Sequence, residues 1–225
     1  MAATDTDIRT RIARRVAQEL RGGQIVNLGI GLPTLVKNFI PANVEVLLQS
    51  ENGMLGLGPE PPADRLDPEI TDAGGRPATI LPGGSFFDTA TSFAMIRGGH
   101  IDVSVLGALE VDAAGNLANW MIPGQFVAGI GGGMDLATGA RHIIVATEHN
   151  TKDGQPKIVE RCSLPLTVVG RVSTIVSELA VMDVTAAGLV VREVAPQVQW
   201  KTLCDRTGAK LIRDLGWWPM ESKES

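Results

Sequence analysis

The sequence predicts an α/β fold built on a mainly parallel sheet with flanking helices and, in its C-terminal third, antiparallel ribbons. Short apolar runs typical of buried strands alternate with helical patterns as far as about residue 148, which is the rhythm of βαβ units. Beyond residue 157, three strand-like runs lie close together in the sequence, as in antiparallel ribbons, so antiparallel pairing is expected. We expect one domain over residues 1–225, with its core at 5–210 and a tail at 211–225.

The first helices and strands follow from apolar spacing and from glycine and proline. Apolar side chains recur every fourth residue among arginines and acids, which predicts an amphipathic helix over residues 7–20. "QIVN" (24–27) is typical of a short buried strand, and Pro33 suits the first turn of a second helix. "VEVLLQS" (44–50) is the next predicted strand, so Glu51 lies at its carboxyl end.

The remaining elements are predicted from the same signals. Prolines mark an irregular segment at 59–77, and glycines mark turns and helix ends further along the chain. The elements expected after that segment are a strand at 78–81, a "PGGS" turn, a helix at 88–97, a strand at 101–111, a hairpin return at 113–124, a glycine turn opening a short helix at 129–140, strands at 142–148, 157–161, 178–184 and 188–195, and a final helix at 196–210.

The composition disfavours several classes of protein. A net charge of −5 argues against a nucleic-acid partner, and the apolar runs fall far short of the roughly 20 residues that span a membrane. The start of the chain has no apolar signal core. Cys162 and Cys204 lack the spacing of a redox pair or metal site, so we expect reduced structural thiols and a cytoplasmic protein.

Glu51 stands between an apolar run and a glycine-rich stretch in "LLQSENGMLGLGP". An acid at a strand end is most simply a helix-cap partner, a surface ion pair or a solvated loop residue. Its neighbours favour a functional carboxylate. Gly53, Gly56 and Gly58 leave room for a bulky ligand to reach it, and the Asn52 amide is available to orient it. Such a carboxylate acts as a general base, a metal ligand or a nucleophile.

Metal ligation and glycosidase chemistry have little support in the sequence. His100, His142 and His149 stand apart without HxH or HExxH spacing, and the acids between residues 59 and 72 lie in a predicted loop where solvation is expected. The role of general base stays open for Glu51, although the sequence has no GxSxG nucleophile motif to accompany it. A nucleophile is the sharper alternative and needs oxyanion donors, for which the backbone N–H groups of "GIGGG" (129–133) are candidates.

Several separate segments resemble one family. They are "NLGIGLP" (27–33), "LQSENGMLGLGP" (48–59), "ILPGGSFF" (80–87), "SFAMIRGGHIDVSVLGALEV" (92–111), "GNLANWMIPG" (115–124), "GGGMDL" (131–136) and "KIVERCSLPLT" (157–167). Together they resemble the class I CoA-transferases, specifically the B (beta) subunit of the succinyl-CoA:3-oxoacid and 3-oxoadipate CoA-transferases. The resemblance covers most of residues 5–210, in the order of the family.

The resemblance implies a fold, a reaction and a substrate class. The fold would be the NagB/RpiA-like fold of CoA-transferases. The carboxylate of Glu51 would attack an acyl-CoA and become a glutamyl-CoA thioester, which a second carboxylic acid then attacks. No metal and no other cofactor is implied, and the two half-reactions predict ping-pong kinetics. The implied donor is succinyl-CoA and the implied acceptor is acetoacetate or another 3-oxoacid, with 3-oxoadipate as the alternative.

The resemblance also assigns roles to residues around Glu51. Gly132 matches the family glycine whose backbone N–H lies at the oxyanion hole, with Gly133 in the usual place of an alanine; a simple tight turn is its alternative role. Asn27 matches a position near the CoA thiol arm, although an amide bonded to nearby backbone is the simpler interpretation without the family. The other expected CoA contacts are Asn52, Gly53 and Gly131.

The resemblance further implies a missing partner. In the family the active site is shared between A and B halves, and the A half brings its own glycine-rich signature and a glutamine that completes the oxyanion hole. The chain resembles only the B half, so we expect it to act with an A subunit, as an A2B2 heterotetramer. Two other functions stay open: a sugar-phosphate isomerase with Glu51 as general base, and a non-catalytic subunit that binds CoA esters.

Other conspicuous residues have simpler interpretations. His149 is expected to be a structural loop residue, and Trp120 is expected to pack in the core or at a subunit contact. Trp217 and Trp218 predict a docking surface. Three scattered bases are candidates for the CoA phosphates, although such sets usually form a solvated face: Lys152, Lys157 and Arg161.

Overall fold

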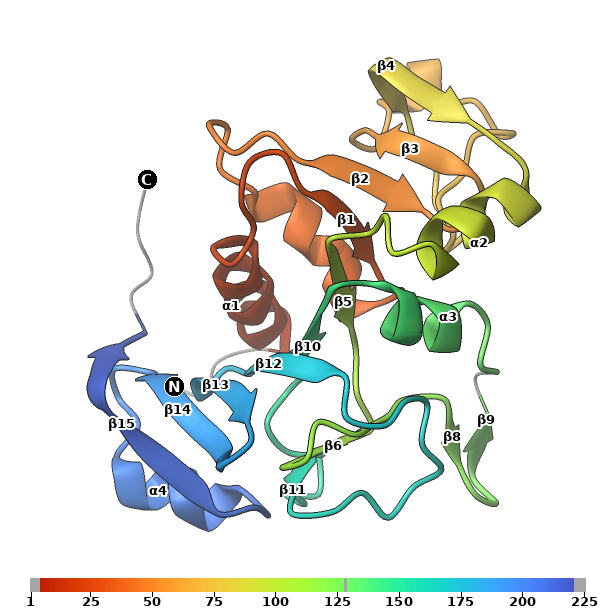
Figure 1. The fold of residues 1–225 in the computed structure, drawn as a ribbon. Helices are drawn as coiled ribbons and strands as arrows, with labels where there is room; N and C mark the ends of the chain where they lie inside the picture. The colour runs from red at the N-terminus through yellow and green to blue at the C-terminus, as the bar shows by residue number, and fades with distance from the viewer. Residues whose placement is uncertain (1–4, 128, 221–225) are drawn as a thin grey trace.

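The computed structural model describes residues 5–127 and 129–220, and within them ten strands form one sheet (Figure 1). These strands are β1 (Ile25–Leu28), β2 (Leu47–Ser50), β3 (Met54–Leu57), β4 (Ile80–Phe86), β5 (Val103–Leu106), β10 (His142–Ala146), β12 (Val172–Val176), β13 (Ala180–Thr185), β14 (Gly188–Val194) and β15 (Leu211–Pro219). Their order across the sheet is β15-β14-β13-β12-β10-β5-β1-β2-β3-β4. The central strands from β12 to β2 are parallel.

Helices and two smaller sheets complete the described structure. The helices are α1 (Asp5–Ala17), the 3-10 helices η1 (Leu32–Phe39) and η2 (Ala63–Arg65), α2 (Thr89–Arg97), α3 (Gly133–Gly139) and α4 (Trp200–Arg206). One small sheet contains β6 (Glu110–Asp112), β7 (Leu117–Ala118) and β11 (Ile158–Val159), and the other is the hairpin of β8 (Met121–Ile122) and β9 (Phe126–Val127).

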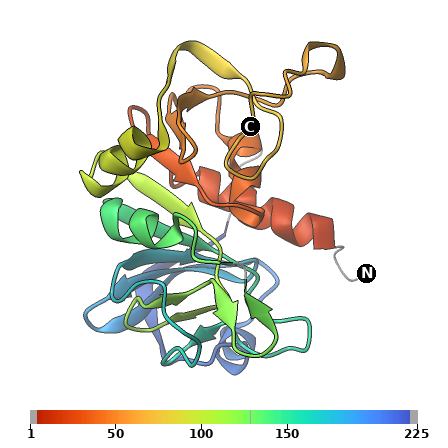
Figure 2. The same ribbon diagram turned by 90° about the vertical axis from the view of Figure 1, so that its right-hand side faces the viewer.

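The large sheet separates two apolar cores because successive side chains of a strand point to opposite faces. Val103 and Val105 of β5 pack in the core that contains α1 and η1, whereas Leu106 packs in the core of α2 and α3. Ile143 and Ile144 of β10 divide in the same way. In Figure 2 α2 and α3 lie one above the other on one side of the molecule, with α1 towards the other side.

The order of the parallel strands makes their carboxyl edge a natural place for a ligand. β2 lies next to β1, while β10 and β12 lie beyond β5 on the other side, so the chain order reverses between β1 and β5. In open α/β sheets, ligands bind outside the carboxyl ends of the strands at such a reversal. Glu51 follows β2 at this edge.

The structure confirms the predicted fold class and most of its elements. The strands around Glu51, the helix before them, the helix after Asp88 and the short helix after the glycines are present. β13 and β14 form the antiparallel ribbon expected in the C-terminal third. The helix predicted after Pro33 is present as the 3-10 helix η1.

Several segments differ from the prediction. The strand expected at 157–161 in an antiparallel ribbon is β11, which pairs in parallel with β6 in a small separate sheet. The "PGGS" turn lies inside β4, which tolerates Pro82 because β4 is the last strand of the sheet. The strand predicted at 101–111 is two strands, β5 and β6, which belong to different sheets. Between residues 161 and 178, where the sequence predicts no strand, β12 pairs in parallel with β10.

The C-terminal segment is not a tail. The final helix ends at Arg206, and residues 211–219 form β15, which pairs in parallel with β14 at the edge of the large sheet. The side chains of Trp217 and Trp218 lie outside the described residues, so the docking surface stays a prediction.

Candidate active site

Glu51 occupies a turn between β2 and β3 that is fixed to the rest of the fold by backbone contacts. The N–H of Gly53 donates to the carbonyl of Ser50 at 3.0 Å, and the N–H of Phe87 donates to the carbonyl of Gly53 at 3.0 Å. Gly53 has a φ of 123°, and a Cβ built there would lie 2.0 Å from the carbonyl oxygen of Phe87. Only glycine fits this position, so the turn that carries Glu51 is closely defined.

The carboxylate of Glu51 lies against Gly132, the residue that precedes α3. A Cβ built on Gly132 would lie 3.0 Å from Cδ and from both carboxylate oxygens of Glu51. The backbone of Gly132 also hydrogen-bonds this carboxylate. Its φ of −80° is open to any residue, so glycine is needed here for space and not for backbone conformation. The structure therefore brings together the two residues to which the family resemblance assigns the chemistry.

The surroundings of Glu51 disfavour its charged form. Burial raises the pKa of this carboxyl group, the hydrogen bond from Gly132 lowers it, and the nearby negative charge of Asp135 raises it, so that the pKa is raised overall. Asp135 lies in the first turn of α3 and accepts a 2.7 Å hydrogen bond from Nε of Arg97, at the end of α2. Glu51 is thus a half-buried carboxylate held by one backbone donor.

The other glycines after Glu51 do not line a ligand path, contrary to the expectation from the sequence. A Cβ on Gly56 would lie 2.9 Å from Cα of Gly84, and one on Gly58 would lie 2.4 Å from Oγ1 of Thr79. Together with Gly53, these residues let the β3 segment approach the β4 segment closely. The space left by the missing side chain of Gly53 is filled by the backbone of Phe87, and a role for Gly53 in binding CoA stays a prediction.

The two predicted asparagines use their amide nitrogens within the protein. Asn52 is exposed, and its Nδ2 donates to the carbonyl of Thr71 at 2.7 Å, which ties the irregular segment to the turn. Asn27 is only 2% exposed, and its Nδ2 donates to Oε1 of Gln49 at 2.6 Å. The nitrogen of Asn27 thus has the intramolecular partner expected without the family, and the nitrogen of Asn52 is directed to Thr71 and not to Glu51. Contacts of the two residues with CoA stay predictions. Among the described residues, Oδ1 of Asn27 has no hydrogen-bond partner.

Gly131 is exposed at the mouth of the site. Its φ is +49°, and a Cβ built there would meet nothing within 4 Å. The backbone beside Gly132 is therefore open to a ligand. A role for Gly131 in binding CoA remains a prediction.

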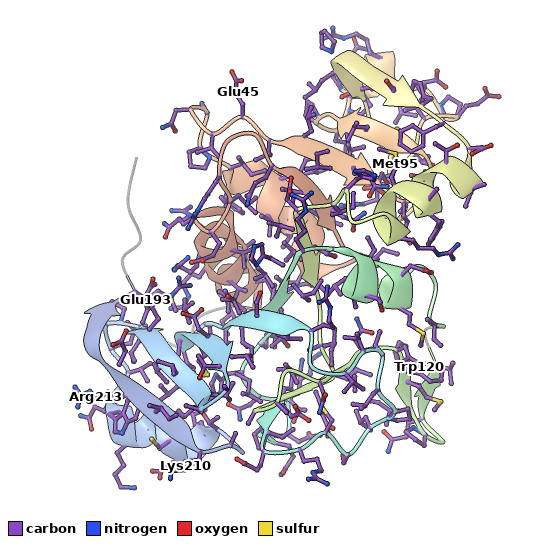
Figure 3. The ribbon with its side chains drawn as sticks, in the orientation of Figure 1. Glu45, Met95, Trp120, Glu193, Lys210 and Arg213 are labelled. Carbon is purple, nitrogen blue, oxygen red and sulfur yellow. The ribbon has the colours of Figure 1, made fainter. Side chains whose placement is uncertain are left out.

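Residues outside this site have the following surroundings, and the packing of Trp120 in the core or at a subunit contact stays a prediction. His149 is fully buried between Oγ of Ser177 and Oγ1 of Thr207, each 2.9 Å from a ring nitrogen, and burial lowers its pKa to about 4. Trp120 is half-buried. Lys152 and Arg161 are exposed and Lys157 is half-buried. Figure 3 shows Trp120 beside the β8–β9 hairpin.

Sequence reasoning missed the pair of Arg97 and Asp135. The two residues are 38 positions apart, and only the packing of α2 on α3 brings them together. The available signal was that Asp135 follows Gly132 by three residues, in the first turn of the helix whose start faces Glu51.

Neither a membrane span nor a metal site is found in the described part of the chain. Over residues 5–127 and 129–220, no helix is long and apolar enough to cross a bilayer. Within the same ranges, no group of three or more His, Cys, Asp or Glu side chains is placed to hold a metal ion.

Comparison with known proteins places this arrangement in a family. The family described as Coenzyme A transferase matches residues 9–204. The chain is 52% identical to the beta subunit of acetate CoA-transferase from Escherichia coli K12, with 91% of this chain and 93% of that subunit covered. It is 47% identical to the B subunit of a probable succinyl-CoA:3-ketoacid coenzyme A transferase from Bacillus subtilis, with 90% and 94% covered.

Two further matches are a relative named for another acid and a solved structure. The B subunit of 3-oxoadipate CoA-transferase from Pseudomonas putida is 45% identical, with 95% of this chain and 100% of that relative covered. Among solved structures, the apoenzyme of the acyl-CoA transferase YdiF from Escherichia coli O157:H7 matches with a TM-score of 0.77 at 21% identity. The match covers 96% of this chain and 44% of that chain.

Proposed function

Because the chain belongs to the coenzyme A transferase family, as the B subunit of a class I enzyme, we propose that it transfers CoA from succinyl-CoA to a 3-oxoacid such as acetoacetate. The transfer proceeds through a thioester on Glu51. The observation that carries this proposal is the contact between the Glu51 carboxylate and the backbone of Gly132.

That contact suits a carboxylate that is itself attacked during the reaction. When a thiolate or a second carboxylate adds to the activated carbonyl of Glu51, negative charge develops on a Glu51 oxygen. The N–H of Gly132 then donates to that oxygen, as a preorganised donor should. A half-buried setting strengthens this hydrogen bond and keeps water from the reactive acyl group.

The proposed reaction proceeds in two balanced half-reactions. The Glu51 carboxylate adds to the acyl-CoA carbonyl and expels CoA thiolate, which leaves a mixed anhydride. The thiolate then adds to the Glu51 carbonyl of the anhydride, so that succinate leaves and glutamyl-CoA forms. The acceptor carboxylate repeats the sequence in reverse and departs as its own CoA ester, which returns Glu51 to a carboxylate. No proton has to be transferred, and no metal or redox cofactor takes part.

The proposed enzyme is a complex of this chain with an A subunit, in the stoichiometry A2B2. Two observations support the need for an A subunit. The relatives of similar length carry the name of a beta or B subunit, and the backbone of Gly132 is the one hydrogen-bond donor to Glu51 found among the described residues. A second oxyanion donor is supplied by the partner subunit. The complex is expected to work in the cytoplasm.

Acetate is a second candidate acceptor, because beta subunits named for acetate CoA-transferase are 52% and 53% identical to this chain. 3-Oxoadipate is a third candidate acceptor, because the B subunit of a 3-oxoadipate CoA-transferase is 45% identical to this chain. All three acids share the carboxylate that attacks the thioester. They differ only in the group beyond it, so the chemistry at Glu51 is common to all of them.

Mass spectrometry of the complex after incubation with succinyl-CoA, without acceptor, tests the thioester. The tryptic peptide 38–65 contains Glu51, and we expect it to gain the mass of CoA in the wild-type chain but not in Glu51→Gln. An unmodified wild-type peptide after incubation with succinyl-, acetyl- and acetoacetyl-CoA would refute the proposal and favour an isomerase or a non-catalytic CoA-binding protein. Release of CoA from the labelled complex by acetoacetate, acetate or 3-oxoadipate then identifies the acceptor.

A further inference from the structure

A second polar region lies at the same edge of the sheet, on the side of α1 and η1. It is a cavity of about 450 Å³ formed by α1, the turn between β1 and η1, and the turn around residue 74. The side chains of Arg9 and Arg76 line it, together with the hydroxyl-bearing Thr10 and Thr34. None of these residues belongs to the site around Glu51.

The cavity continues towards the residue that precedes Glu51. A smaller cavity of about 20 Å³ shares Ile30, Thr34, Gly74 and Arg76 with the larger one, and it is also lined by Lys37 and Ser50. Ser50 is the last residue of β2. The two adjoining cavities therefore lead from the nucleophile's strand to the arginines.

Hydrogen bonds fix the arginine-bearing turn relative to Glu51. The N–H of Ala73 donates to Oγ of Ser50 at 2.9 Å, and Nδ2 of Asn52 donates to the carbonyl of Thr71 at 2.7 Å. The residues on either side of Glu51 thus both hold the segment that carries Arg76. A ligand bound at Arg76 is consequently held at a fixed position relative to the Glu51 carboxylate.

The charges around the two cavities suit an anion. Three cations, Arg9, Lys37 and Arg76, face a single acid, Asp72. The Asp72 carboxylate is largely committed to its own turn, because Oδ1 accepts the N–H groups of Gly74 at 2.9 Å and of Arg76 at 3.0 Å. Arg76 reaches Oδ2 at 3.4 Å with one nitrogen, and its side chain stays 43% exposed. Guanidinium donors in such a setting bind phosphate.

The walls of the larger cavity leave space for a ligand. A Cβ built on Gly31 would meet nothing within 4 Å, and the φ of Gly31 is +92°. Ile30 is 67% exposed beside it, which offers an apolar contact to an uncharged part of the same ligand. A ligand with an alkyl arm and a phosphorylated end fits these features.

We propose that the cavity lined by Arg9 and Arg76 binds the phosphate groups of the CoA substrate while its thiol end reaches Glu51. This inference rests on the proposed function, since it concerns the same substrate. It assigns the CoA phosphates to residues other than Lys152, Lys157 and Arg161.

Isothermal titration of the reconstituted complex with free coenzyme A and with pantetheine, which lacks the phosphates, tests the proposal. Arg9→Gln and Arg76→Gln are each expected to weaken CoA binding by about tenfold, which corresponds to about 1.4 kcal/mol, and to leave pantetheine binding unchanged. Arg161→Gln is the matched control and should change neither. Since Arg76 also helps to hold its turn, Arg9→Gln is the decisive variant if Arg76→Gln binds both ligands more weakly.

The possible outcomes separate this proposal from the proposed function. Unchanged CoA binding in Arg9→Gln, or an equal loss for CoA and pantetheine, would overturn the phosphate assignment. If the wild-type complex acquires CoA on Glu51 while the arginine variants bind CoA normally, the proposed function stands and only the cavity assignment fails. If Glu51 is never labelled, the proposed function itself fails.

Discussion

Two half-buried glutamates, Glu19 and Glu51, have pKa values that are shifted in opposite directions. Burial raises the pKa of both Glu19 and Glu51. Glu19 is bound by Nη2 of Arg15 at 2.6 Å and by Nη2 of Arg192 at 2.9 Å, so its pKa falls below the ordinary value. Glu51 has a backbone hydrogen bond and the negative charge of Asp135, so its pKa rises. The fold thus pairs cations with the structural carboxylate of Glu19 and leaves Glu51, the proposed nucleophile, without one, as suits a carboxylate with a perturbed pKa at a functional site.

The cluster around Glu19 also holds distant parts of the chain together. Nε of Arg15 donates to Oε2 of Glu193 at 2.7 Å, which joins α1 to β14. Arg15 is 6% exposed. A charge so deeply buried is stable only with its partners. Loss of one partner would leave the others buried and unpaired, so the cluster is structural, whereas Glu51 is the residue to which the proposed function assigns the chemistry.

The largest effect is expected from Glu51→Gln, which removes the proposed nucleophile and keeps the shape of the side chain. Turnover by the complex should fall by on the order of 10⁴-fold or more, as for other nucleophile replacements. Steady-state assays with succinyl-CoA and acetoacetate measure this. A variant that keeps wild-type turnover would show that Glu51 is not the nucleophile.

The same variant should be more stable than the wild type at neutral pH. Because the folded-state pKa of Glu51 is raised, its stabilising contribution is present below the unfolded pKa and is lost as the pH rises through the folded pKa. Glutamine stays neutral, so the thermal unfolding temperature of Glu51→Gln should exceed that of the wild type above this window. Below the ordinary glutamate pKa the difference should disappear.

Breaking the cluster around Glu19 should produce the converse pattern. Arg15→Met leaves Glu193 and Glu19 without their buried partner, and we expect a loss of about 3 kcal/mol in the free energy of unfolding. Denaturant titration measures it. Labelling of Glu51 by CoA at low temperature should persist. The control is Lys201→Met, which breaks an exposed pair with Asp205 and should leave stability unchanged.

Gly132→Ala tests the contact that carries the proposed function. Its Cβ would lie 3.0 Å from the carboxylate, so Glu51 must shift away from the donor, and we expect turnover to fall by about 10²-fold. Gly133→Ala is the matched control, because a Cβ there meets nothing within 4 Å. Equal activity of the two variants would remove Gly132 from the site.

The smallest effect is expected from Asp135→Asn. Removal of this negative charge lowers the pKa of Glu51, so the acid limb of the pH profile for thioester formation should move to lower pH. Asparagine keeps an acceptor for Arg97, so the packing of α2 on α3 is retained. An acid limb that stays in place or moves upward would contradict the electrostatic coupling.

Local sequence patterns are sufficient to place Glu51 but not to explain its glycines. An apolar run followed by an acid predicts a strand end, and the structure has Glu51 there. The contact with Gly132 spans 81 positions; the glycine run at 129–133 is a candidate donor from the sequence, but only the family resemblance singles out Gly132. Gly53 and Gly56 suggest access for a ligand, but a missing side chain equally permits the approach of another backbone. Only tertiary structure decides between the two.

The misplaced strands have a similar cause. Pro82 with Gly83 and Gly84 is a strong local turn signal, but pairing with β3 on one side only makes the segment an edge strand. The run at 101–111 is continuous in apolar character, while the chain changes sheets after Leu106. Residues 211–219 lack regular alternation but are held by the hydrogen bonds of β14. Long-range pairing overrides local preference in each case.

Because Gly53 lies against the backbone of Phe87, the acid and the glycine of "SENG" differ in how readily each can be replaced during evolution. The carboxylate of Glu51 is only half-buried and can be exchanged with little harm to folding, whereas any side chain at Gly53 would collide with a backbone carbonyl 2.0 Å away. A descendant that abandons transferase chemistry is therefore free to replace the acid but must retain the glycine. Such a lineage would keep the fold around this turn but would have a different residue in place of Glu51. Its site would then be open to a new reaction.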